Sequence, residues 1–299
     1  MDILKPFGKF DLLYFYTKIA PAVVDFLKNK EIASKIHVSS KIGFFIRRGS
    51  KDEPLFIEEL CSKELDEEFF KIRAETQREE AIKQNKLSKL QAKVWLYFPP
   101  DKCIDFFYAC NKEGQGKQLD RIFIDVDRVN LSSESALEVT KKLIELIKQD
   151  KALNNLINYS IKVLWTGSSF HVYLMLKRSI TLETYNKYFA YSKAEPLESF
   201  IGRWAEEISR STEIKVIGGH EKQKDRIVLD PSQTPSGKLA RAPFSLHFEK
   251  NPVKKEKSIN GICVPLSEKM LEDKQLIKKL KALTPEKVLK EIDFWKKNL

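Results

Sequence analysis

The sequence has no long apolar run. No window of its 299 residues approaches the roughly 18 unbroken apolar residues that a membrane-spanning helix needs. The first ten residues, MDILKPFGKF, also lack the basic region, the apolar stretch and the small-residue cleavage site of a secretory signal. We therefore expect a cytoplasmic protein that does not bind a membrane.

Cysteine is scarce as well. The four cysteines, Cys61, Cys103, Cys110 and Cys263, are scattered along the chain and form no C-x-x-C pair. This spacing indicates neither a disulfide framework nor a zinc ribbon. We expect these residues to be thiols of the hydrophobic core.

Positive charge, in contrast, is plentiful. Lys and Arg number 53 against 42 Asp and Glu, which gives a formal net charge of +11. Such an excess favours a polyanionic partner such as nucleic acid, although lysine-rich and glutamate-rich surfaces also serve solubility and ion pairing alone. The hydrophobic content of 42% suffices for one large or two modest domains with genuine cores.

Periodicity predicts both helices and strands. Apolar residues recur at helical spacing at 9–27, 132–150, around 181–210 and at 266–295, and the charged segment at 60–93 is typical of exposed helices. Strands are predicted at 34–49, 93–98, 103–110, 121–127, 161–167, 170–176, 226–230 and 238–248. Residues 111–118 contain G-x-G-K without the full Walker spacing, so we expect a hairpin loop there, and an exposed basic loop at 250–258.

Two carboxylates interrupt the strand predicted at 121–127. Asp125 and Asp127 project from one face because side chains two apart in a strand point the same way, whereas Ile124 and Val126 face the opposite way. Like charges in a low dielectric repel, and a divalent cation such as Mg²⁺ or Mn²⁺ is the simplest compensation. The pair therefore predicts a metal platform, although an isolated D-x-D also suits a strand exit beside a helix cap.

Two further segments carry candidate polar groups. Ser168, Ser169 and His171 lie at a tight turn leading into the strand at 170–176, and hydroxyl, imidazole and backbone N–H groups of such a turn suit phosphate oxygens. The strand at 226–230 ends in Asp230, directly before a proline. Taken alone, His171 also fits a structural histidine and Asp230 a turn-initiating aspartate.

Taken in order, D-V-D at 125–127, S-F-H at 169–171 and L-D at 229–230 resemble the three motifs of the archaeo-eukaryotic primase superfamily. Two longer stretches are similar to the polymerase domain of bacterial LigD-type repair ligases and to stand-alone archaeal end-joining polymerases. These stretches are FGKFDLLYFYTKIAPAVVDFL at 7–27 and RIVLDPSQTPSGKLARAPFSLHF at 226–248.

The resemblance implies an α/β (α+β) fold with a primase-type core, in which a mixed, largely antiparallel sheet bears the carboxylates and is flanked by helices. It implies a single catalytic domain over residues 1–299. Within it we expect an N-terminal module with a charged insertion at 1–93, the catalytic core at 94–266 and C-terminal helices at 267–299.

The resemblance also implies a role for each matched position. Three aspartates would be catalytic and would hold two Mg²⁺ or Mn²⁺ ions: Asp125, Asp127 and Asp230. A second set would bind the nucleotide: Ser168, Ser169, His171, Arg241, Ser245 and His247. A surface ion pair for Arg241 and a core position for His247 are the alternatives.

Three basic residues are candidates for DNA contact. Lys9 matches a lysine that contacts a 5′-phosphate in end-joining relatives, and Arg47 and Arg48 would line a template path or cover a strand end. The neighbouring Phe44 and Phe45 would either stack on bases or pack in the core.

The predicted activity is template-dependent nucleotidyl transfer from NTPs or dNTPs, in primer synthesis or in gap filling and end joining, with a ligase, helicase or nuclease as a possible partner. The scattered cysteines disfavour a replicative primase small subunit, which usually carries a zinc motif. Ser169-Phe170 stands where end-joining enzymes usually have Gly-Leu, and His247 where they typically have Arg. A metal-dependent nuclease and an inert nucleic-acid-binding subunit are the alternatives.

Overall fold

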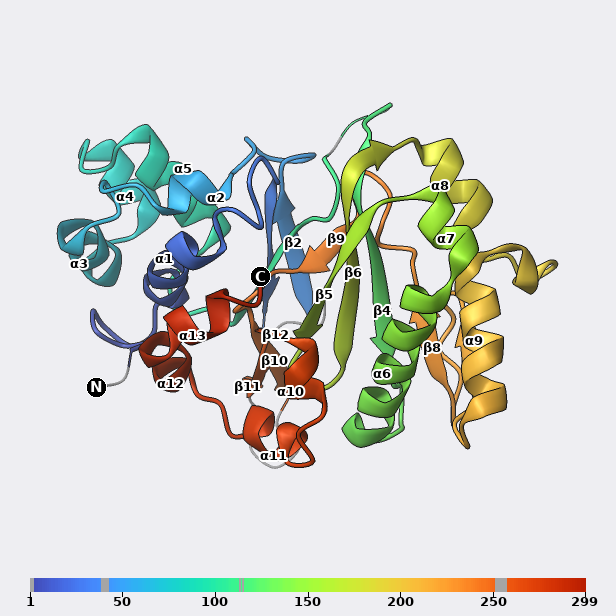
Figure 1. Ribbon diagram of the computed structural model, residues 1–299. Coiled ribbons are helices and arrows are strands. Elements are labelled where there is room, and N and C mark those ends of the chain that lie inside the picture. The colour runs from blue at the N-terminus through green and yellow to red at the C-terminus, as the bar shows by residue number, and fades with distance from the viewer. Residues whose placement is uncertain (1–2, 39–42, 113, 115, 251–256) are drawn as a thin grey trace.

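The computed structural model describes residues 3–38, 43–112, 114, 116–250 and 257–299 (Figure 1). Its sheets lie between two groups of helices. In Figure 1, helices α1 to α5 lie to the left of the sheets and helices α6 to α9 to the right. Of the C-terminal helices, α10 and α11 lie at the bottom of the view, and α12 and α13 return to the left-hand group beside α1.

The largest sheet carries the segments of all three sequence motifs. Its strand order is β12-β5-β6-β4-β8-β7; β7 and β8 pair in parallel, and the other neighbours pair antiparallel. β4 therefore lies in the interior of the sheet, between β6 and β8. The strands are β4 (Leu119–Asp127), β5 (Tyr159–Trp165), β6 (Phe170–Ile180), β7 (Val216–Gly218), β8 (Ile227–Asp230) and β12 (Val264–Leu266).

Two smaller sheets accompany it. A four-stranded antiparallel sheet has the order β2-β1-β3-β9, with β1 (Ile32–His37), β2 (Phe44–Arg48), β3 (Ile104–Ala109) and β9 (Leu239–Arg241). A two-stranded antiparallel sheet pairs β10 (Leu246–Lys250) with β11 (Lys257–Ile262). The mixed α/β fold with largely antiparallel sheets flanked by helices confirms the fold class predicted from the sequence.

The helices fall into three groups along the chain. The first contains α1 (Leu12–Val23), α2 (Ile57–Leu60), α3 (Glu67–Glu75), α4 (Arg78–Lys83) and α5 (Lys89–Tyr97). The second contains α6 (Ser133–Gln149), α7 (Lys151–Leu156), α8 (Leu182–Tyr188) and α9 (Phe200–Ser211). The third contains α10 (Glu268–Leu271), α11 (Leu276–Lys281), α12 (Pro285–Lys290) and α13 (Ile292–Lys296). Within the described ranges, no helix combines the length and the apolar character needed to cross a bilayer.

Local sequence explains several of these boundaries. Asp11 caps α1 by accepting a hydrogen bond from the backbone N–H of Leu13 at 3.1 Å. Its carboxylate also receives the buried guanidinium of Arg73 on α3, with Nε–Oδ2 2.7 Å and Nη2–Oδ1 2.8 Å. This paired charge fastens the charged segment at 60–93 to α1, and Phe69 and Phe70 of the same segment are buried.

Three expectations about the elements are wrong. Residues 93–98 end helix α5 instead of forming a strand, because Ser88 and Gln91 form a capping box that starts a helix through them. Residues 111–118 are not a hairpin loop, since they join β3 and β4, which belong to different sheets. The segment 238–248 forms two strands, β9 and β10, with a turn between them.

Two other expectations are met in part. Of the four cysteines expected in the core, Cys110 and Cys263 are buried, whereas Cys61 is exposed and Cys103 is half-buried. Residues 251–256 of the basic loop expected at 250–258 lie outside the described residues.

Candidate active site

Asp125 and Asp127 lie on one face of β4. Ile122, Ile124 and Val126 point to the opposite face and are fully buried. Each such side chain contributes about 1.5–3 kcal/mol of burial free energy, which fixes the register of β4. The alternation therefore holds both carboxylates on one face.

Asp230 joins them from the neighbouring strand. In the antiparallel pairing of β4 and β8, Asp230 stands directly opposite Asp125. Oδ1 of Asp230 accepts the backbone N–H of Ser232 at 2.8 Å, which ends the strand in a turn. Because paired residues of adjacent strands share a face, the structure brings the three sequence-predicted carboxylates together.

Crowding of these carboxylates changes the chemistry of Asp125. Enclosure in the protein, together with the carboxylates of Asp127 and Asp230, raises the pKa of Asp125 from 3.8 to about 7, although Lys222 and Arg241 act in the opposite direction. The side chain is still 35% exposed, so this face of β4 is open to a ligand. Negative charge at Asp125 is thus only partly neutralised by the protein itself.

Asp127 already has partners for both of its oxygens. Oδ1 accepts the backbone N–H of Val129 at 3.0 Å, and Oδ2 lies 2.9 Å from Nζ of Lys222 on the loop between β7 and β8. Val129 has a φ of 51°, in the left-handed region that a β-branched residue rarely adopts. Strained backbone of this kind gathers at functional sites.

The turn between β5 and β6 reaches the end of β4. The hydroxyl of Ser169 donates to the carbonyl of Val126, and the carbonyl of Ser168 accepts Nε of Arg128 at 3.0 Å and the hydroxyl of Ser133 at 2.8 Å. Both serines therefore fasten the turn to the aspartate strand. The Ser169 hydroxyl is engaged by the backbone and does not itself point to a ligand here.

His171 lies opposite Asp125 in the pairing of β4 and β6. Its Nε2 is 3.7 Å from Oδ1 of Asp125, and its buried Nδ1 has no hydrogen-bond partner among the described residues. Burial, together with Arg241 and His247, lowers its pKa from 6.5 to about 3. His171 is thus a neutral imidazole that could donate a hydrogen bond to an incoming anion, whose negative charge would favour the protonated form.

Arg241 and His247 approach the carboxylates from the other sheets. Nη2 of Arg241 lies 3.3 Å from Oδ2 of the buried Asp105 on β3, and Nδ1 of His247 lies 3.4 Å from the carbonyl of Thr166. Arg241 is therefore in a largely buried ion pair, not a surface one. Burial is the main cause of the lowered pKa of His247, and Arg241 adds to it.

A close backbone contact brings His247 to the β5–β6 turn. Gly167 adopts a φ of 103°, and a Cβ on Gly261 of β11 would lie only 2.5 Å from the Cα of Gly167. Only glycines permit this approach. The contact packs the β10–β11 pair against the turn that carries Ser168 and Ser169.

Ser245 has a different place from the one expected. It is fully buried, accepts the backbone N–H of Phe106 at 2.9 Å and donates to the carbonyl of Leu246 at 3.0 Å. Its hydroxyl joins the four-stranded sheet to the β9–β10 turn. The side chain therefore lies in the protein interior, with both hydrogen-bonding functions used by the backbone.

The three candidate DNA contacts lie on other elements than the carboxylates. Lys9 is exposed beside Gly8, which packs against Ala74 of α3, and Figure 1 places α3 and β4 at opposite sides of the molecule. Arg47 and Arg48 lie on β2, the edge strand of the four-stranded sheet.

Both arginines of β2 have partners in the protein. Arg47 donates to Asp52 at 3.1 Å and lies over the ring of Phe45, whereas Arg48 donates to the carbonyl of Gly237, just before β9. The adjacent Phe44 is 44% exposed.

The donor set fits a hard divalent ion. Three carboxylates offer only oxygen ligands, which Mg²⁺ and Mn²⁺ prefer, and burial together with the two neighbouring carboxylates raises the pKa of Asp125. As the side chains stand, no group of three or more His, Cys, Asp or Glu residues in the described ranges is placed to hold a metal ion. Metal binding therefore requires the carboxylates to leave their present partners.

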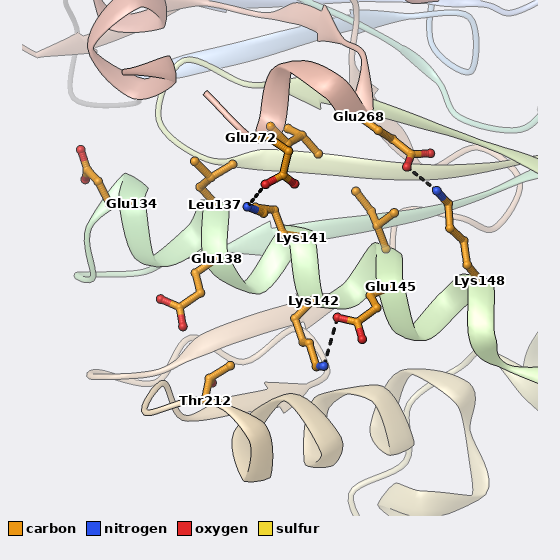
Figure 2. A pocket seen from close by; sticks show the side chains of 12 residues that line it. Glu134, Leu137, Glu138, Lys141, Lys142, Glu145, Lys148, Thr212, Glu268 and Glu272 are labelled. Atoms are coloured by element: carbon orange, nitrogen blue, oxygen red, sulfur yellow. Dashed lines mark hydrogen bonds and ion pairs between the residues drawn. The ribbon is translucent and has the colours of Figure 1, made fainter. Parts of the chain in front are cut away.

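A groove elsewhere on the molecule is distinct from this site. A hollow of about 660 Å³ between α6 and α10 is lined by five glutamates and three lysines, and Figure 2 shows the side chains that line it. Ion pairs link Lys141 to Glu272 and Lys142 to Glu145, and Lys148 to Glu268. The acidic lining disfavours a nucleic-acid phosphate, and none of the candidate site residues lines the groove.

The chain resembles a polymerase domain in fold. A solved structure entitled "Polymerase Domain from Mycobacterium tuberculosis Ligase D in complex with DNA" superposes with a TM-score of 0.55, at 14% sequence identity, over 95% of this chain and 88% of that chain. At this identity the likeness establishes the fold. No family model matches the sequence, and no curated protein matches it.

Two charged residues of the site, Asp105 and Lys222, were not predicted from the sequence. Asp105 interrupts an apolar strand just as Asp125 does, so the same signal was present in CIDFFYAC at 103–110. Lys222 lies in a charged loop whose pattern carries no sign of its ion pair with Asp127. Its position depends on the parallel pairing of β7 with β8, which no local pattern predicts.

Proposed function

We propose that this protein is a template-directed nucleotidyltransferase of the primase-polymerase type, which adds NTPs or dNTPs to a 3′-hydroxyl with two Mg²⁺ or Mn²⁺ ions. The observation that carries the proposal is the register of β4 and β8, in which Asp125 faces Asp230 and Asp127 shares their face. The polymerase-domain fold is consistent with it.

The three aspartates would hold the ions. Bound divalent ions supply electrophilic stabilisation of the entering and leaving oxygens of phosphoryl transfer. Asp125, partly exposed between Asp127 and Asp230, is the central ligand in this arrangement. Its high proton affinity would be replaced by affinity for a metal ion, since both relieve the same repulsion.

The triphosphate would lie between the β5–β6 turn and β10. His171 offers a buried nitrogen without a partner, and Arg241 and His247 add donors from the adjoining strands. Ser168 and Ser169 would act by fixing the turn, because their hydrogen bonds go to β4 and its following loop. Ser245 would act only by fixing the turn between β9 and β10.

Unpaired bases of the template would use the four-stranded sheet. An apolar hollow of about 190 Å³ is lined by Phe44, Ile46, Phe107 and Leu239, together with Lys35, whose ammonium lies 4.4 Å from the centre of the Phe44 ring. Arg241 lies over Phe107, so this hollow adjoins the proposed triphosphate site. Exposed aromatic rings beside cations are the usual platform for single-stranded nucleic acid.

The DNA strands on either side of a gap would contact the remaining candidate basic residues. Arg47 and Arg48 follow Ile46, which lines the hollow, along β2, and Lys9 would contact a 5′-phosphate at the outer helices. Cooperation with a ligase, helicase or nuclease belongs to the same proposal.

Incubation with Mn²⁺, labelled nucleotides and a template, with and without primer, tests the activity. We expect extension by the wild type and its loss in Asp125→Asn and Asp127→Asn, with Asp293→Asn, an exposed C-terminal substitution, as the matched control. Unchanged extension by Asp125→Asn and Asp127→Asn would refute the proposal.

Two controls separate the alternatives. Degradation of labelled DNA without added nucleotides would indicate a nuclease. Salt-sensitive DNA binding that is indifferent to metal and to the aspartates, without extension, would indicate an inert binding subunit. A 5′-phosphorylated gapped duplex, compared with an unprimed template, distinguishes end joining from priming and tests Lys9→Gln.

A further inference from the structure

Lys222 occupies the place that a cation would take at Asp127. Its Nζ lies 2.9 Å from Oδ2, while the other oxygen of Asp127 is held by the backbone N–H of Val129. Lys222 is 72% exposed and Asp127 24% exposed, so the contact lies at the mouth of the carboxylate site. A metal ion that approaches Asp127 from solvent meets this ammonium first.

The loop that carries Lys222 is anchored at both of its ends. At the β7 end, a Cβ on Gly218 would lie 2.3 Å from the ring of Tyr191, so this glycine lets the ring pack directly on the backbone. At the β8 end, Asn130 and Asp225 exchange two hydrogen bonds of 2.9 Å, which tie the loop to the segment after β4. The anchors set the loop over Asp127 and leave the lysine side chain able to move.

We propose that Lys222 is a resident counter-ion of the carboxylate site, which neutralises Asp127 until a divalent ion displaces it and then binds the phosphate that accompanies the ion. This inference rests on the proposed metal-dependent function. It explains how three crowded carboxylates persist in a folded protein although their side chains are not converged on a metal position.

The relative strengths of the two interactions favour exchange of Lys222 for a divalent ion at Asp127. The ion pair between Lys222 and Asp127 is largely exposed, and pairs of this kind are weak because solvent screens them. A single ammonium cannot bridge three carboxylates, whereas a divalent ion accepts several oxygen ligands at once. The ordinary pKa of a lysine is 10.5, so the displaced side chain remains positively charged and suited to a phosphate.

Mn²⁺ titration followed by electron paramagnetic resonance tests the displacement without any turnover. The wild type is compared with Lys222→Gln and with Lys224→Gln, an exposed lysine of the same loop as matched control. Work at about pH 8.5 keeps Asp125 ionised, since removing Lys222 raises the pKa of Asp125 further. We expect Lys222→Gln to bind Mn²⁺ roughly three- to tenfold more tightly and Lys224→Gln to match the wild type.

A second titration uses inorganic triphosphate on the Mn²⁺-loaded proteins. Lys222→Gln should bind it several-fold more weakly than the wild type, so the substitution has opposite effects on the two ligands. Equal or weaker Mn²⁺ binding by Lys222→Gln would overturn the inference, as would unchanged triphosphate binding. If instead the wild type binds no more Mn²⁺ than Asp125→Asn does, the proposed function itself fails.

Discussion

Two strand aspartates in this protein have opposite surroundings. Asp105 on β3 is almost fully buried and receives hydrogen bonds from Nε2 of His37 at 3.3 Å, from Arg241 at 3.3 Å and from the backbone N–H of Phe248 at 3.2 Å. Burial alone would raise its pKa, but the hydrogen bond from His37 and the charge of Arg241 outweigh it and hold the pKa below the ordinary value.

Asp125 on β4 shows the reverse balance. Burial and two neighbouring carboxylates raise its pKa to about 7, and its nearest basic side chain on the paired strand, His171, is neutral. The fold places basic side chains in contact with Asp105, whereas it leaves the negative charge around Asp125 only partly compensated. An acid of the first kind is part of the structure, whereas an acid of the second kind marks a candidate functional site.

Asp105→Asn should give the largest effect in this comparison. The substitution removes the charge that neutralises Arg241 and that accepts the hydrogen bond of His37, and breaking a buried pair typically costs about 3–5 kcal/mol of unfolding free energy. Urea denaturation at neutral pH measures it. A loss of unfolding free energy below about 1 kcal/mol would show that Asp105 does not have the structural role that distinguishes it from Asp125.

His171 should make the protein sensitive to acid. Its folded pKa of about 3 lies below the unfolded value of 6.5, so the unfolded chain binds the extra proton in this window and stability falls as the pH drops through it. We expect a contribution on the order of 2 kcal/mol between about pH 6.5 and 4 that is absent in His171→Gln. The two unfolding curves measured against pH should therefore converge in acid, and parallel curves would contradict the buried neutral imidazole.

Asp125→Asn should stabilise the metal-free protein. The folded pKa of Asp125 lies above its ordinary 3.8, so the folded state binds the extra proton between these values and stability falls as the pH rises towards about 7. Because the side chain is partly exposed and screened, we expect a gain of only about 1 kcal/mol at pH 8, shrinking towards pH 4. Thermal unfolding of the wild type and of Asp125→Asn at pH 8 and at pH 4 measures this gain. A variant that is less stable than the wild type at pH 8 would contradict the difference drawn between Asp125 and Asp105.

Asp230→Asn should give the smallest effect. Asp230 raises the pKa of Asp125 less than burial and Asp127 do, so its neutralisation should lower that pKa by a fraction of a unit. Carboxyl-carbon NMR titration of the wild type and the variant measures the shift. No change would mean that the two side chains are more separated than their opposed register implies.

Sequence predicted the strands of the site because their apolar residues alternate locally. β4, β5, β6 and β8 were all found, and with them Asp125, His171 and Asp230. The segment at 93–98 was misassigned because its apolar residues fit a strand as well as a helix, and the helix is decided upstream, by the capping box at Ser88.

The rest of the site depends on contacts between distant segments. Ser245 was expected to face a nucleotide, but its hydroxyl meets Phe106, 139 residues away. Lys222 reaches Asp127 only through the pairing of β7 with β8. Such partners are selected by sheet topology, which alternation within a single strand does not encode.

The most direct test of the central claim, that Asp125, Asp127 and Asp230 await a divalent cation, is thermal unfolding with and without Mn²⁺ at about pH 8. The account predicts that Mn²⁺ stabilises the wild type, by about 2.7 kcal/mol at a hundredfold excess over Kd, and leaves Asp125→Asn unchanged. Equal stabilisation of both proteins, or of neither, would contradict it.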